Sequence, residues 1–235
     1  MRFGRPRRHL RRCDSTNSLA RELAAGGAPS GTVVTADEQT AGRGRLGRTW
    51  VAPAGKALLY SAILTPLEHR HRLLPLAVPV AVCEAVEAVA PVGAAIKWPN
   101  DVWIGDRKCA GVLIEARPQD GWAVIGVGVN VAIEAGEFPA DLRTPAISIG
   151  HGATVDATLD ALNERLAEWV AAEEEAVLAA FRERDLLLDR EVAWEDCQGI
   201  ATGIDDRGNL LVRKADGPEL SLGAGEVHLR LGPAD

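Results

Sequence analysis

The sequence predicts an α+β protein in which a larger domain, residues 1–188, precedes a small β-barrel, residues 189–235. Three observations favour this organisation. A content of 47% hydrophobic residues in a chain of 235 supports a sizeable core. Strand-like and helix-like runs alternate as far as Leu188. The composition changes there, and short strand-like runs separated by turns follow.

The elements follow from hydrophobic spacing and from the residues that stop each run. Apolar residues at helical spacing after Asp14 predict a helix that Gly26 and Gly27 end. Further on in the larger domain we expect strands over 32–36, 57–64, 109–115 and 122–130, and helical stretches over 75–89 and 154–188. Within the last stretch, Glu173-Glu174-Glu175 is either a solvated turn or a solvated helix face. In the barrel we expect strands over 191–194, 199–204, 209–213, 219–222 and 226–231.

Composition and charge exclude several classes of protein. A net charge of −7 argues against a nucleic-acid binder, so we expect no DNA partner. No signal peptide and no membrane-spanning run are visible. Four scattered cysteines without a C-x-x-C pair indicate a reducing compartment and argue against a zinc site. We therefore expect a cytoplasmic protein that contacts no membrane and has no metal-ligating cluster.

Six arginines occur within residues 1–12. A solvated first strand or tail is the favoured interpretation. Contact with nucleic acid or with an acidic partner is the alternative.

The most informative stretch is residues 42–50, Gly-Arg-Gly-Arg-Leu-Gly-Arg-Thr-Trp. Its arginines carry planar cationic groups suited to phosphate and carboxylate oxygens, and its glycines allow close backbone approach. We predict a mobile loop that an anion orders. The stretch also reads G-x-G-x-x-G, but Pro53 and Gly55 stand where a dinucleotide-binding fold needs a helix.

Residues 95–115 form a second informative block. A tight turn at Gly105-Asp106 predicts a hairpin that brings Asp101 towards Lys108. The two side chains form either a structural ion pair or a reaction centre. In the second case Lys108 holds an anion, and Asp101 orients or deprotonates an incoming amine.

Two further segments allow both a structural and a functional interpretation. Ser15, Thr16 and Asn17 are ordinary helix caps, or they present polar groups to a ligand at the helix N-terminus. Gly126 and Gly128 share one face of a strand, which suits either a crowding helix or close approach of a ligand.

These motifs, in this order, resemble the signature of biotin protein ligases. The matching segments are 14–17 (Asp-Ser-Thr-Asn), the loop 42–50, 97–101 (Lys-Trp-Pro-Asn-Asp), 108–115 and 126–130. The resemblance covers most of the chain. Lipoate ligases are similar in fold, but their Arg-Arg and triple-glycine pattern is absent here.

The resemblance implies a mixed central sheet flanked by helices, the class II synthetase-like catalytic fold, followed by an SH3-like barrel. It implies that biotin and MgATP give biotinyl-5′-adenylate, which then modifies one lysine of the biotin carboxyl carrier domain of a carboxylase. The signature begins at residue 14, so we expect a monofunctional ligase without a DNA-binding domain, either monomer or homodimer. A lipoyl- or octanoyl-transferring enzyme and a biotin-responsive DNA-binding regulator are the alternatives.

The resemblance also implies a set of site residues. The residues expected to contact biotin are Ser15, Thr16, Asn17, Gln39, Gly42, Arg43, Gly44, Arg45, Lys108, Gly111, Leu113, Gly126 and Gly128. The residues expected to contact ATP or the adenylate are Arg43, Arg45, Arg48, Trp50, Asn100, Lys108 and Asn130. Lys108, Asp101 and Arg45 are the expected catalytic residues. Phosphates and water would hold Mg²⁺, so no residue is assigned to a metal.

Overall fold

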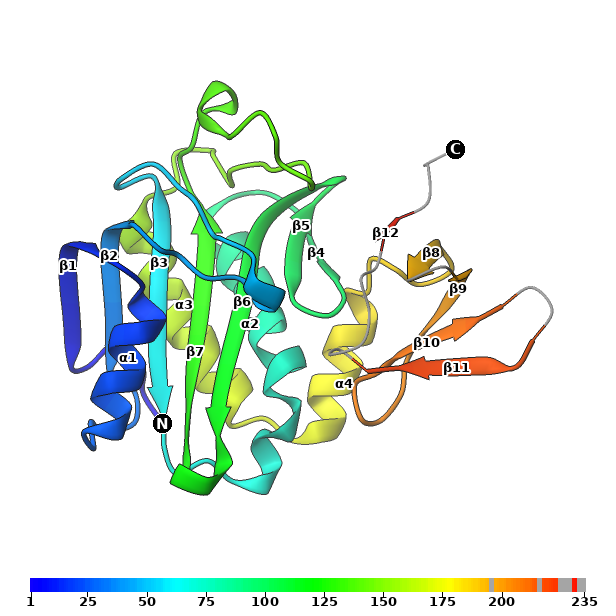
Figure 1. Cartoon of the computed structure of the whole chain (residues 1–235), viewed down its shortest axis with the longest axis horizontal. Coiled ribbons are helices and arrows are strands. Elements are labelled where there is room, and N and C mark those ends of the chain that lie inside the picture. Colours follow the sequence, from blue (N-terminus) through cyan, green and yellow to red (C-terminus); the bar gives the residue numbers. More distant parts are fainter. Residues whose placement is uncertain (195–196, 215–216, 224–229, 232–235) are drawn as a thin grey trace.

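The computed structural model describes residues 1–194, 197–214, 217–223 and 230–231. A seven-stranded mixed sheet with helices on both faces forms the larger part, and an antiparallel sheet lies beside it (Figure 1). The predicted α+β fold is confirmed. No helix of the described residues is both long and apolar enough to cross a bilayer.

The large sheet has the strand order β1-β2-β3-β7-β6-β5-β4. Only the β1–β2 pair is parallel, and the other neighbours are antiparallel. In that order the strands are Arg7–Cys13, Val33–Gln39, Ala57–Leu64, Trp122–Asn130, Arg107–Arg117, Asp101–Ile104 and Ala94–Lys97. The strands predicted over 57–64 and 122–130 are confirmed to the residue. The arginine-rich start of the chain becomes the edge strand β1.

The two faces of the sheet are covered differently. Helix α1 (Thr16–Ala25) lies against the front face in Figure 1, whereas α2 (Leu74–Val89) and α3 (Val155–Val170) cover the rear. Helix α2 is apolar except for Glu84 and Glu87, because it lies between the sheet and the helices α3 and α4 (Glu174–Glu183). Short 3₁₀ turns occur at Arg45–Gly47, His69–Leu73, Pro118–Asp120 and Ala135–Glu137.

The helical stretch expected over 154–188 is two helices, so that prediction is wrong in detail. The break falls at residues 171–173, which are Ala-Ala-Glu and carry no glycine or proline. Local propensity therefore gives no signal for a break. Packing is the physical reason, because Leu178 and Phe181 of α4 are buried in the core shared with α2.

The C-terminal strands form an open antiparallel sheet in the order β11-β10-β9-β8-β12. These strands are Glu219–Leu222, Leu210–Arg213, Cys197–Ile204, Glu191–Trp194 and Arg230–Leu231. The described strands do not close into the expected barrel, because no pairing joins β11 to β12 among them. Of the strand predicted over 226–231, residues 226–229 lie outside the described residues.

The two sheets share one apolar core. Val192, Ile204 and Leu210 of the small sheet belong to the same buried cluster as Leu76 of α2. The turn between β9 and β10 carries the closest link, where Trp98 Nε1 donates to the Gly208 carbonyl over 2.9 Å. A methyl group at Gly208 would lie 2.9 Å from Leu76 Cδ1, so this turn packs directly on α2.

We expect a chain that ends at Leu188 to unfold at a lower temperature than the whole protein. Removing the C-terminal strands uncovers Trp98 and Leu76, and each buried apolar side chain left exposed costs about 1.5–3 kcal/mol. Because 1 kcal/mol corresponds to about 2–4 °C in a domain of this size, the midpoint should fall by at least about 6 °C. Thermal unfolding followed by circular dichroism measures the shift.

Arg182→Ala is the control for that experiment. It removes an exposed ion pair with Asp206 across the same junction, at 3.2 Å, and should cost less than about 1 kcal/mol. If the truncated chain had the same melting temperature as the whole protein, this would contradict the conclusion that the two sheets share one core.

Candidate functional site

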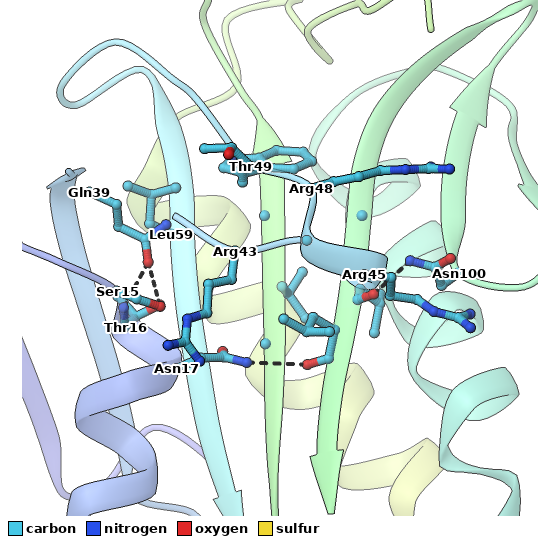
Figure 2. A pocket seen from close by; sticks show the side chains of 18 of the residues that line it. Ser15, Thr16, Asn17, Gln39, Arg43, Arg45, Arg48, Thr49, Leu59 and Asn100 are labelled. Atoms are coloured by element: carbon cyan, nitrogen blue, oxygen red, sulfur yellow. Dashed lines mark hydrogen bonds between the residues drawn. The ribbon is translucent and has the colours of Figure 1, made fainter. Parts of the chain in front are cut away.

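A pocket lies between the loop 42–50 and the front face of the sheet (Figure 2). It collects residues from the start of α1, the end of β2, the middle of β6 and β7, and the loop. Every site residue expected from the sequence lines this pocket except Gly42 and Asn130. Five motifs far apart in the chain therefore meet in one place.

Hydroxyl and amide groups fill one end of the pocket. The backbone nitrogen and Oγ1 of Thr16 both donate to Gln39 Oε1, over 2.7 and 3.0 Å. Ser15 is the N-cap of α1, but its side chain makes no capping hydrogen bond. The cap interpretation of Ser15 is therefore wrong, and its hydroxyl belongs to the pocket lining.

Asn17 is held in one orientation by Glu115 and Ser61, neither of which is among the expected site residues. Its Nδ2 donates to Glu115 Oε2 over 2.9 Å, and its Oδ1 accepts from Ser61 Oγ over 2.5 Å. Glu115 also accepts from Arg21 and lies 3.7 Å from Arg43 of the loop. Ser61 carried a sequence signal, since it is the only hydroxyl in an otherwise apolar eight-residue strand apart from its neighbour Tyr60.

The paired glycines of β7 make room for the protein's own side chains. A methyl group at Gly126 would lie 2.2 Å from Asn17 Oδ1, and one at Gly128 would lie 2.5 Å from the Trp50 indole. The crowding-helix interpretation therefore fits Gly126, because Asn17 belongs to α1. At Gly128 the close group is an aromatic ring from the loop, which forms the wall of the pocket above the sheet.

The loop folds back on itself over the sheet. Arg43 and Thr49 form an isolated bridge, and Trp50 donates its backbone N–H to the Gly42 carbonyl over 3.0 Å. At the tip Leu46 has a φ of 56° and Gly47 a φ of 73°, so the turn uses left-handed backbone at two successive residues. No long helix opens from the loop, which agrees with the rejection of a dinucleotide-binding fold.

Cationic groups line the other end of the pocket. Lys108 Nζ lies 2.6 Å from Asp101 Oδ1, as the predicted hairpin required. Figure 2 shows Arg43 directed towards Asn17 and Arg45 extending beside Asn100, whereas Arg48 runs over the sheet above Asn100 in this view. Burial lowers the pKa of the Arg45 guanidinium, and nearby Asp101 partly opposes this shift. Arg45 nevertheless stays charged, since an arginine is not deprotonated in proteins.

Gly42 and Asn130 lie outside the pocket lining. Gly42, the first residue of the loop, packs against the last one, since a methyl group at Gly42 would lie 2.3 Å from the Trp50 carbonyl oxygen. Asn130 is buried, and its Nδ2 donates to the Ile147 carbonyl over 3.2 Å. Both residues thus support neighbouring backbone in this conformation. No group of three or more metal-ligating side chains occurs in the described part of the chain.

The arrangement suits a ligand with a polar head and an anionic end. Donors and acceptors at the α1 end can hydrogen-bond an uncharged head group. Cations at the β6 end can hold carboxylate and phosphate oxygens. Between the two ends, Gly126 and Gly128 carry no side chain of their own, and Asn17 and Trp50 lie close over them as walls of the pocket.

The chain matches two protein-family models. Residues 9–131 match the biotin/lipoate A/B protein ligase family, and residues 188–230 match the biotin protein ligase C-terminal domain.

Named relatives and solved structures agree with these matches. The chain is 35% identical over 235 residues to the biotin–[acetyl-CoA-carboxylase] ligase of Mycobacterium tuberculosis, covering 92% of this chain and 86% of that one. It is 41% identical over 143 residues to the bifunctional ligase/repressor BirA of Bacillus spizizenii, covering 58% of this chain. The match spans 44% of that relative's own length. The structure of Aquifex aeolicus biotin protein ligase in complex with biotin and ATP is similar, with a TM-score of 0.84 and 27% identity, over 97% of this chain and 100% of that one.

Proposed function

Because the chain belongs to the biotin/lipoate A/B protein ligase family, we propose that it activates biotin with ATP and transfers it to a carrier protein. The observation that carries this proposal is the pocket itself. It joins a hydrogen-bonding end at Thr16, Asn17 and Gln39 to a cationic end at Lys108. The ureido group of biotin needs both donors and acceptors, and its carboxylate needs cations near the α-phosphate of ATP.

In the first step the biotin carboxylate attacks the α-phosphorus and pyrophosphate leaves. Two anions must approach each other, so the main task of the site is to neutralise charge that builds up in the transition state. Lys108 and Arg45 have this role in our proposal, and Arg43 and Arg48 bind the nucleotide phosphates with them. Mg²⁺ enters with ATP and is held by phosphate oxygens and water.

In the second step the lysine amine of the carrier attacks the acyl carbon of the adenylate, and AMP leaves. An amine with an unperturbed pKa near 10.4 is mostly protonated at neutral pH. The Asp101 carboxylate, which lies at the pocket wall beside Lys108, can dock this ammonium and accept its proton. We propose Trp50, Asn100 and Asn130 as the residues nearest the adenosine moiety.

The names of the relatives support a carrier domain of a biotin-dependent carboxylase, such as acetyl-CoA carboxylase, as the partner. We propose that residues 1–188 are the catalytic domain and residues 189–235 the C-terminal domain, in keeping with the residues that the two family models match. We place the reaction in the cytoplasm, where ATP is present and where free thiols, like the four in this chain, stay reduced.

The test of this function is exchange of labelled pyrophosphate into ATP. Exchange reports reversible adenylate formation without a carrier protein, and we expect it to require biotin. Octanoate or lipoate in place of biotin should give none. Exchange that is independent of biotin, or equal with octanoate, would contradict the proposal.

Gly126→Ala should weaken biotin binding while ATP binding changes little. The added methyl would displace Asn17, because it would lie 2.2 Å from Asn17 Oδ1. Losing one hydrogen bond between the oriented amide and the neutral ureido group costs about 0.5–1.5 kcal/mol, or about two- to twelve-fold in the KM for biotin. Steady-state kinetics with each substrate varied in turn measure the two KM values.

Gly93→Ala is the matched control, since nothing lies within 4 Å of the methyl that it adds. An unchanged KM for biotin in Gly126→Ala would show that the orientation of Asn17 does not matter for binding.

A further inference from the structure

Lys97 is a half-buried lysine that the proposed mechanism has not yet used. It ends β4 and lies opposite Asp101 of β5 in the antiparallel register. Its ammonium group lies 4.8 Å from the centroid of the Trp103 ring. Among the described residues no acidic side chain forms an ion pair with Lys97, because the neighbouring Asp101 is engaged by Lys108 at 2.6 Å.

The surroundings of Lys97 favour an anionic ligand. Burial lowers the pKa of its ammonium group, Asp101 opposes this shift, and Lys108 and Arg48 add to it. Lys97, Lys108 and Arg45 all lie close enough to the Asp101 carboxylate to interact with it. Keeping the Lys97 ammonium desolvated without an ion-pair partner is costly, and an anion that enters the pocket would lower this cost. The Trp103 ring gives Lys97 only a weak cation–π contact in the meantime.

The strand order shows which part of the ligand would reach Lys97, provided that the proposed function holds. From the biotin end the pocket crosses β2 at Gln39, β3 at Leu59, β7 at Gly126 and β6 at Lys108, and then β5 and β4 follow. In phosphoryl transfer the attacking and leaving oxygens lie roughly in line on opposite sides of the phosphorus. Since biotin approaches Lys108 from the β7 side, the leaving group points towards β5 and β4.

The distance along this path is compatible with a polyphosphate. Neighbouring strands are about 4.8 Å apart, so β4 lies about 10 Å from β6. Lys97 lies on the far side of that span, with Asp101 between it and Lys108 in the sheet. The long side chain of Lys97 can extend over part of the distance between β4 and β6.

We propose that Lys97 binds the β- and γ-phosphates of ATP and stabilises the pyrophosphate that leaves, whereas Lys108 acts at the α-phosphate. A bond forms between a biotin carboxylate oxygen and the α-phosphorus. The bond from that phosphorus to the bridging oxygen breaks, and its electron pair stays on pyrophosphate next to the Lys97 ammonium. No proton moves in this step.

This role predicts that the two half-reactions respond differently to loss of the Lys97 charge. Pyrophosphate is present only in the first half-reaction, because AMP is the leaving group in the second. Lys97→Met keeps an apolar stem of similar length and removes the charge. We expect adenylate formation to slow about ten- to a hundred-fold, the range for one charge-assisted contact, with a raised KM for ATP. Inhibition by added pyrophosphate should weaken by a similar factor.

Transfer from preformed biotinyl-adenylate to the carrier should be unchanged in Lys97→Met. The melting temperature should not fall, since the variant removes a desolvated charge without an ion pair. Lys97→Arg, which keeps a cation, should recover part of the adenylation rate. Lys56→Met is the matched control, because Lys56 pairs with Glu137 outside the pocket.

The experiment measures both half-reactions in single turnover, with the pyrophosphate inhibition constant and the melting temperature, for the wild type and these three variants. Wild-type adenylation tests the proposed function separately from the role of Lys97. Equal losses in both half-reactions, unchanged adenylation, or a lowered melting temperature in Lys97→Met would each overturn the proposal.

Discussion

Lys108→Ala should slow both half-reactions by about thirty- to a thousand-fold, which corresponds to about 2–4 kcal/mol of lost transition-state stabilisation. Lys108 lies at the cationic end of the pocket, is only 23% exposed in its side chain, and lies 3.1 Å from the position of a methyl group at Gly111. It therefore faces the part of the sheet where the carboxylate and the α-phosphate would meet. Both reactions place negative charge there.

The fold should survive this substitution. Asp101 loses its 2.6 Å partner, but Lys97 lies opposite it on β4 and keeps a positive charge nearby. Circular dichroism and thermal unfolding check this, and single-turnover formation and transfer of adenylate measure the two steps. Lys56→Ala is the control for loss of a lysine outside the pocket. Near-normal pyrophosphate release by a folded Lys108→Ala protein would remove Lys108 from the reaction centre.

Arg45→Gly should give an enzyme that makes adenylate but retains it poorly. The adenylate is a mixed anhydride that acylates any amine, so the enzyme must enclose it until the carrier docks. The loop 42–50 covers the pocket, and Arg45 points from the loop towards Asn100 (Figure 2). Losing one guanidinium contact to phosphate costs about 1.5–3 kcal/mol, or about ten- to a hundred-fold faster dissociation if the loss falls on the off-rate.

The measurement is the dissociation rate of preformed adenylate, with a streptavidin blot of serum albumin as a bystander protein. Arg45→Ala removes the charge without adding a glycine, and should leak as well. Leu46→Gly adds a glycine at a residue that already has a φ of 56° and keeps the charge, so it should retain adenylate normally. Adenylate that dissociates as slowly from Arg45→Gly as from the wild type would mean that this loop is not the lid.

Much of the fold could be predicted because strong local signals agree with the final packing. Strand Trp122–Asn130 is a nearly continuous apolar run, and the turn at Gly105-Asp106 defines a hairpin. The break between α3 and α4 could not be decided from the sequence, because Ala171 and its neighbours favour helix and the acidic run that begins at Glu173 suits a turn and a helix face equally. The open arrangement of the C-terminal strands also depends on pairings between distant segments.

The candidate site could be predicted to a similar degree. Cationic and glycine-rich motifs mark the chemistry in the sequence, and the structure brings them together. Ser61 and Glu115 were missed because each acts by orienting Asn17, and that relation exists only after β3, β6 and α1 have packed. The space at Gly128 could not be assigned either, since it is taken by Trp50 from another segment.

The most direct test of the central claim is the intact mass of a biotin carboxyl carrier domain after incubation with this protein, biotin and ATP. The pocket and the family predict the addition of one biotinyl group, at a single lysine, that depends on both small substrates. A lipoyl or octanoyl increment when those acids are offered beside biotin, or no adduct at all, would contradict the account.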